Sequence, residues 1–113
     1  MLYYHVAENG WDGDDLTSLV SQYGESEAIE LFCERWPEAE NSAYEHSSRI
    51  HLHSTLDEAK KYWSVDKTGD ILAIELDEDA ESECCIVIDE LEYPHPVACE
   101  DIPAEYISVV KPN

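Results

Sequence analysis

The segment Ile50-His51-Leu52-His53-Ser54-Thr55-Leu56-Asp57-Glu58-Ala59 is the stretch of sequence that decides the expected fold. Its first residues alternate strictly, so Ile50 and Leu52 share one face of a predicted strand and the two histidines share the other. Thr55 is a good helix N-cap, and apolar residues follow at helical spacing as far as Trp63. A strand that runs directly into a helix indicates a fold that mixes the two kinds of structure.

Other apolar, β-rich runs predict the remaining strands. They cover residues 2–6, 71–76, 84–88 and 106–110. Pro94 and Pro96 bracket a further segment that we expect to be a loop or an edge strand, because proline cannot donate a hydrogen bond to a sheet.

Capping and helix-breaking residues predict two more helices. The first is capped by Asp14 or Asp15 and ends at Gly24, and the second is capped by Ser26 and ends at Pro37. We expect residues 37–48 and the acidic residues 77–83 to be connections. The order of elements predicts an α+β fold with a mainly antiparallel twisted sheet and about three helices, in a single domain of residues 1–113.

The charge of the chain is strongly and unevenly negative. There are 27 Asp and Glu against 6 Lys and Arg, which gives a formal net charge of −21. No Lys or Arg occurs from Thr68 to Val110, where thirteen acidic residues fall. Such a surface repels nucleic acids and anionic membranes and attracts cationic proteins. The acidic face expected to meet such a partner is residues 75–92.

Composition also predicts a cytoplasmic protein. No apolar run approaches the ~20 residues of a membrane span, and the N-terminus does not resemble a secretory signal. The four cysteines, Cys33, Cys84, Cys85 and Cys99, form no CxxC pair. We expect them to be reduced and structural, with at least one of the adjacent pair in the core.

Most of the cationic residues lie in one segment. Arg49, Lys60, Lys61 and Lys67 could contact a phosphate, although the lysines could equally lie on the solvated face of a helix. His51 and His53, two residues apart on a strand, could in principle chelate a metal, but half-exposed strand positions explain them equally well. We predict no metal site.

Several short motifs, in order along the chain, resemble those of the ADP-ribosyltransferase-like fold. They are Tyr4-His5-Val6 at the start, residues 50–59 as a strand running into a helix, residues 70–76 as the next strand, and Ile102-Pro103-Ala104-Glu105-Tyr106-Ile107 near the end. The last motif is similar to the ending of small relatives such as RNA 2′-phosphotransferases and DNA-targeting ADP-ribosyltransferases.

The resemblance implies an NAD-binding site. It assigns catalytic roles to His5, His53 and Glu92, of which the glutamate would stabilise an oxocarbenium-like transition state. Tyr4, His5, Arg49, His51 and Ser54 would contact the cofactor. Because the glutamate stands slightly early for the family pattern, the sequence leaves catalysis open.

Two functions of different kinds therefore follow from the sequence. The first is an ADP-ribosyltransferase-like domain, catalytic or not, that binds NAD or a related nucleotide. The alternative is an acidic inhibitor or nucleic-acid mimic, of the anti-restriction or anti-CRISPR type found in phages, that binds a basic protein partner. An antitoxin-like protein that neutralises a basic partner belongs to the same class.

Overall fold

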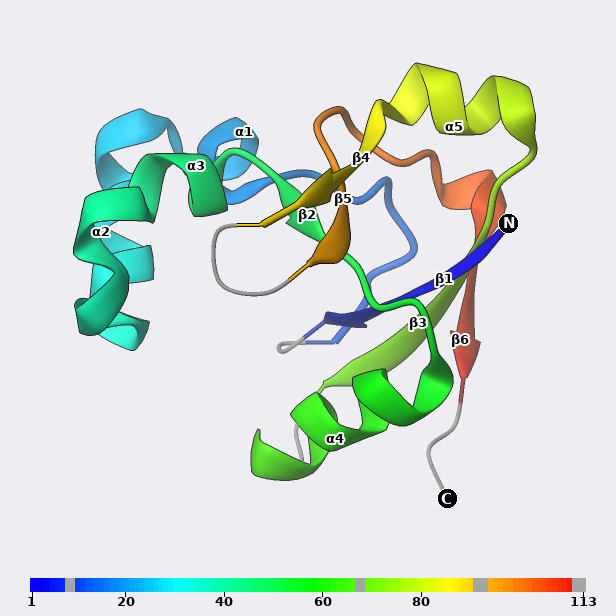
Figure 1. Ribbon diagram of the computed structural model, residues 1–113, viewed down its shortest axis with the longest axis horizontal. Coiled ribbons are helices and arrows are strands. Elements are labelled where there is room, and N and C mark those ends of the chain that lie inside the picture. The colour runs from blue at the N-terminus through cyan, green and yellow to red at the C-terminus, as the bar shows by residue number, and fades with distance from the viewer. Residues whose placement is uncertain (8–9, 67–68, 91–93, 111–113) are drawn as a thin grey trace.

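The computed structural model describes residues 1–7, 10–66, 69–90 and 94–110 (Figure 1). Within these residues the chain forms five α-helices and two small antiparallel sheets, which confirms the predicted α+β class. In chain order the elements are β1 (Leu2–Ala7), α1 (Leu19–Tyr23), α2 (Glu25–Arg35), a 3₁₀ helix (Pro37–Ser42), α3 (Ala43–Ser47), β2 (Ile50–His51), α4 (Leu56–Asp66), β3 (Asp70–Glu75), α5 (Glu78–Cys84), β4 (Ile86–Asp89), β5 (His95–Ala98), a second 3₁₀ helix (Ala104–Tyr106) and β6 (Ile107–Val110).

The strands form two three-stranded sheets instead of the one sheet that the sequence predicts. The first has the order β1-β3-β6 and the second the order β2-β5-β4. An isolated bridge joins them, because the Tyr4 N–H donates to the His53 carbonyl at 2.9 Å and the His53 N–H donates to the Tyr4 carbonyl at 2.7 Å. The pairing goes no further because the chain turns at Ser54 into α4.

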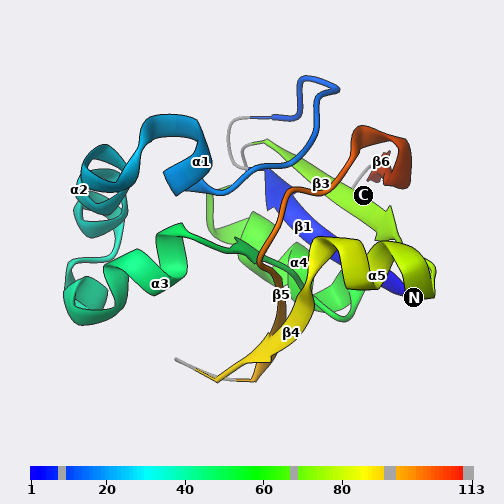
Figure 2. The same cartoon turned by 90° about the horizontal axis from the view of Figure 1, so that it is seen from above.

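The main hydrophobic core is shared by both sheets and α5. Its members include Leu52 beside β2, Leu72 and Ile74 of β3, and Ala80 of α5, all almost completely buried. The other face of the first sheet is covered by α4, which packs against β1 and β3 (Figure 1). Helices α1, α2 and α3 pack together beside the second sheet (Figure 2). None of the helices in the described parts of the chain is long and apolar enough to cross a membrane.

Helices α1 and α2 begin at other residues than the caps predicted from the sequence. Helix α1 starts after Ser18, whose side chain accepts a hydrogen bond from the Ser21 N–H at 3.2 Å. Asp15 cannot cap it, because its carboxylate accepts from the Ala104 N–H at 2.8 Å and the next residue, Leu16, pairs with Ile102 in a β-bridge. Helix α2 starts after glycine 24 and makes no side-chain cap bond, so the predicted cap at Ser26 is wrong.

Two predicted connections are helical. Residues 37–48 contain the first 3₁₀ helix and α3, and the acidic residues after Asp77 form α5. Asp77 caps α5 by accepting from the Ala80 N–H at 2.8 Å, and acidic side chains are favourable in the first turn of a helix. Because α5 continues to Cys84, the next strand begins at Ile86, two residues later than predicted.

The segment that contains Pro94 and Pro96 forms the central strand of the second sheet. Pro96 is tolerated inside β5 because its nitrogen, which carries no hydrogen, faces the short strand β2. In a strand the N–H and C=O of one residue face the same neighbour. The Pro96 carbonyl accepts from the Leu52 N–H at 3.0 Å, so the missing N–H also lies on the side of β2, which has only two residues.

Candidate functional site

The predicted site residues of β1 and of the segment around β2 lie side by side. Tyr4 and His53 form the bridge between the sheets, and the His5 ring hydrogen-bonds to the His51 carbonyl through Nδ1 at 2.7 Å. These residues are more than 45 positions apart in sequence. The structure therefore brings Tyr4, His5, His51 and His53 together at the junction of the two sheets, and Ser54 follows as an exposed residue.

His5 is held as a neutral imidazole of known tautomer. A carbonyl can only accept, so Nδ1 of His5 carries the hydrogen and Nε2 is the acceptor nitrogen. Burial lowers the pKa of His5, while the hydrogen bond to the His51 carbonyl opposes that shift. At neutral pH this ring offers an uncharged hydrogen-bond acceptor.

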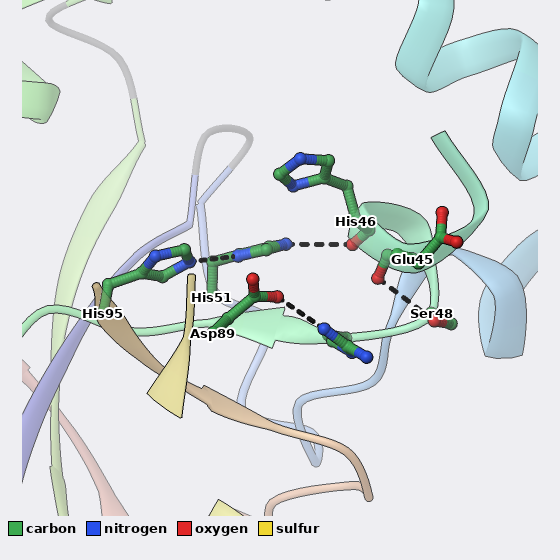
Figure 3. A network of polar contacts seen from close by, with 7 residues as sticks. Glu45, His46, Ser48, His51, Asp89 and His95 are labelled. Atoms are coloured by element: carbon green, nitrogen blue, oxygen red, sulfur yellow. Dashed lines mark hydrogen bonds and ion pairs between the residues drawn. The ribbon is translucent and has the colours of Figure 1, made fainter. Parts of the chain in front are cut away.

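His51 links two further histidines (Figure 3). Its Nε2 donates to the His46 carbonyl at 3.0 Å, and its Nδ1 lies 2.8 Å from Nε2 of His95. Because Nε2 of the neutral His51 carries the hydrogen, Nδ1 must accept, and His95 donates. Burial lowers the pKa of His51 to about 4, and the hydrogen bond to the His46 carbonyl is the largest effect that opposes this shift. The neighbouring His95 and His46 add to the lowering of this pKa, and Asp89 opposes it.

Two ring pairs of this network are stacked, Phe32 with His46 and His51 with His95, and the rings of His46 and His51 are tilted against each other. Phe32 and His46 lie 5.1 Å apart between centroids, His46 and His51 5.2 Å, and His51 and His95 5.1 Å. The pKa of His53 is also lowered to about 4, first by burial and then by the neighbouring His5, with Glu58 acting in the opposite direction. All five histidines of the chain thus interact with one another, and we call His5, His46, His51, His53 and His95 the histidine cluster.

Arg49 is engaged by a carboxylate of the second sheet. Its guanidinium donates to Asp89 of β4 at 2.6 Å, and the Asp89 side chain is completely buried while that of Arg49 is 32% exposed. With Ile88 and Glu90 the two residues line an open surface depression of about 530 Å³. The side chain that the resemblance assigns to the cofactor is therefore already paired within the protein.

The other residues predicted to form the site lie on α4 or outside the described residues. Glu92, the predicted catalytic carboxylate, lies outside the described residues, as does Lys67. Lys60 and Lys61 are on α4, half-buried and exposed respectively. In the described part of the chain no three His, Cys, Asp or Glu side chains are arranged to hold a metal ion.

Two residues of the site were not found from the sequence, and a third, His46, was noted only as a neighbour of the cationic segment around Arg49. His95 and Asp89 complete the network, but His95 lies in a segment that looks like a loop or an edge strand, and Asp89 looks like one more acid among many. The only available signal was the five histidines themselves, in a chain with few other basic residues.

Comparison with known protein families, curated proteins and solved structures finds no match for this chain. The fold and the site define an α+β protein with a histidine cluster at the junction of its two sheets.

Proposed function

We propose that this chain is an ADP-ribosyltransferase-like domain that binds NAD or a related nucleotide where its two sheets meet. The observation that carries the proposal is the contact of β1 with the segment after β2, through the Tyr4–His53 bridge and the hydrogen bond from His5 to the His51 carbonyl. These are the segments that the family resemblance assigns to the cofactor.

The chemistry of the histidines suits the nicotinamide riboside half of the ligand, which carries no phosphate. A neutral His5 with its hydrogen on Nδ1 can accept a hydrogen bond from a ribose hydroxyl through Nε2. The pyrophosphate is less well served, because Arg49 is paired with Asp89 and the overall charge is −21. We therefore expect the nicotinamide riboside part to supply most of the affinity, and salt to strengthen NAD binding by screening the repulsion.

Catalysis requires more than binding. A transfer reaction needs a carboxylate that stabilises the oxocarbenium-like transition state, and the resemblance assigns this role to Glu92. The proposal covers nucleotide binding, and Glu92→Gln tests the chemical step: it should abolish any NAD cleavage while leaving binding intact.

Isothermal titration with NAD and with nicotinamide riboside tests the binding. We expect saturable binding of both ligands, with affinities within tenfold of each other, and loss of both in His5→Ala. The double variant Asp79→Lys/Glu83→Lys, on exposed positions of α5, is the matched control and should bind the riboside like the parent chain. Absence of binding to the parent, or binding that survives in a folded His5→Ala variant, would overturn the proposal.

The acidic surface supports the alternative function, binding to a basic protein. Asp77 caps α5, and Glu78, Asp79 and Glu83 are exposed, so these carboxylates stand on an ordered helix. A rigid array of negative charge favours fast association with a cationic surface and loses affinity as salt is added. The same double variant would then weaken capture of a basic nucleic-acid-binding protein, whereas His5→Ala would not.

A further inference from the structure

Two of the four cysteines lie opposite each other at the end of the β4–β5 pair. The antiparallel register of β4 and β5 ends with Ile86 opposite Ala98, and Cys85 and Cys99 are the residues directly beyond this pair. The backbone follows this pairing, because the Cys99 N–H donates to the Cys85 carbonyl at 3.2 Å. Opposite residues of an antiparallel ladder have Cα atoms about 4.5–5.5 Å apart, within the ~4.4–6.8 Å that a disulfide spans.

The side chains are also placed to react. Cys85 lies close enough to Cys99 to raise the pKa of the Cys99 thiol, and both residues are exposed. The other two cysteines differ: Cys84 is only 1% exposed within the core, and Cys33 lies half-buried on α2. Both members of the facing pair are therefore accessible to a reagent in solution, contrary to the prediction that all four cysteines are structural.

The backbone at Cys85 is a further indication. This residue ends α5 in the left-handed region, at φ 54°, and it is the one residue other than glycine with a positive φ in the described part of the chain. Glycine or asparagine is the usual choice at such a position. A cysteine placed there at a conformational cost is better explained by what its sulfur does than by its role as a helix cap.

We propose that Cys85 and Cys99 are a dithiol–disulfide pair that a low-molecular-weight disulfide oxidises. The thiolate of one cysteine attacks the reagent, forms a mixed disulfide and releases one thiol. The thiolate of the second cysteine then attacks the protein sulfur of that mixed disulfide and releases the other thiol. Two electrons pass from the cysteine pair to the reagent, and the two thiol protons end on its two products.

The surroundings of the pair predict how it reacts. Partial desolvation, and then the neighbouring Cys85, raise the pKa of Cys99, with Arg49 opposing the shift and Glu100 adding to it. A raised pKa slows attack at neutral pH and leaves the reduced form without the thiolate stabilisation that makes a disulfide easy to reduce. The product should therefore form slowly and resist reduction. Glu100 and the net charge of −21 should make cationic cystamine react faster than anionic oxidised glutathione.

Mass spectrometry of the oxidised chain gives a direct test. After equilibration with cystamine and cysteamine, the parent chain should lose two hydrogen masses and keep two thiols open to alkylation after denaturation. Cleavage after glutamate releases Cys84 and Cys85 in residues 84–90 and Cys99 in residues 93–100, so the disulfide joins these two peptides. In Cys99→Ser the reaction should stop at a mixed disulfide on Cys85, while Cys33→Ser should behave like the parent.

Two further measurements complete the test. Oxidation should raise the thermal unfolding midpoint by about 10 °C in the parent, since the bond closes a loop of roughly 15 residues, and should not raise it in Cys85→Ser. Cystamine should react at least tenfold faster than oxidised glutathione, with the difference shrinking at high salt. Four alkylatable thiols after equilibration, or a linkage that persists in Cys85→Ser, would overturn the proposal.

Discussion

Acidification should destabilise this protein through its buried histidines. His51 and His53 have pKa values of about 4 in the folded chain, against about 6.5 in the unfolded chain. Because the folded pKa values are lowered, the unfolded state takes up protons first. Stability is therefore full above about pH 7 and is lost as the pH falls towards 4.

The size of the effect follows from the two shifts. At pH 5 the unfolded form of each histidine is almost fully protonated and the folded form almost fully neutral, which costs about 2 kcal/mol per residue relative to pH 8. The two residues together cost about 4 kcal/mol, a large part of the 5–15 kcal/mol of a typical domain. His5, whose pKa is also lowered, acts in the same direction. The structural reason is clear for His51, since a second proton would go to the Nδ1 that accepts from His95.

Denaturant unfolding followed by tryptophan fluorescence measures this loss. It should be carried out from about pH 8 to pH 5 at constant, high salt, so that the falling repulsion between carboxylates contributes little. His53→Gln should reduce the loss by about 2 kcal/mol, while Asp79→Asn, on the exposed side of α5, should not change it. A His51 or His53 ring that titrates near 6.5 in the folded protein by NMR, or equal slopes in the two variants, would refute the reasoning.

Three other substitutions have expected effects on stability. Arg49→Ala removes the cation from the buried Asp89 carboxylate and should cost about 3 kcal/mol by denaturant unfolding, and a loss below 1 kcal/mol would show that the pair contributes little. Asp77→Ala removes the hydrogen bond to the Ala80 N–H and should cost about 1 kcal/mol, whereas Asp77→Asn should restore most of it. Cys85→Gly should stabilise the reduced chain by about 1 kcal/mol because φ is 54° there, and a decrease would contradict the strain argument.

Local sequence patterns predicted the elements that local interactions form. The strand at residues 71–76 and the Gly24 helix end are present to within a residue. Thr55 caps α4 as expected, since its hydroxyl accepts from the Glu58 N–H at 3.2 Å. Each of these features depends on residues within one turn or one strand of one another.

Features that depend on distant residues were not predicted. Asp15 was expected to cap a helix, but it is held by Ala104, 89 positions away. The histidine network depends on His95 reaching His51 across 44 positions, which no local pattern encodes. Helix α5 is a different case, because its acidic sequence suggested a solvated turn although Ala80 and Cys84 stand at helical spacing and are both buried.

The chain approaches zero net charge and protonates two of its buried histidines over the same range of pH, near pH 4. The sequence pI is about 4.1, and the pKa values of His51 and His53 are about 4. Net charge, which opposes association between chains, therefore vanishes in the same pH range in which His51 and His53 take up charge. We expect irreversible aggregation near pH 4, measured by light scattering, to be reduced in His53→Gln, whose precipitate should redissolve with native fluorescence. Fully reversible precipitation of the parent chain would show that the cluster stays closed there and that only net charge controls solubility.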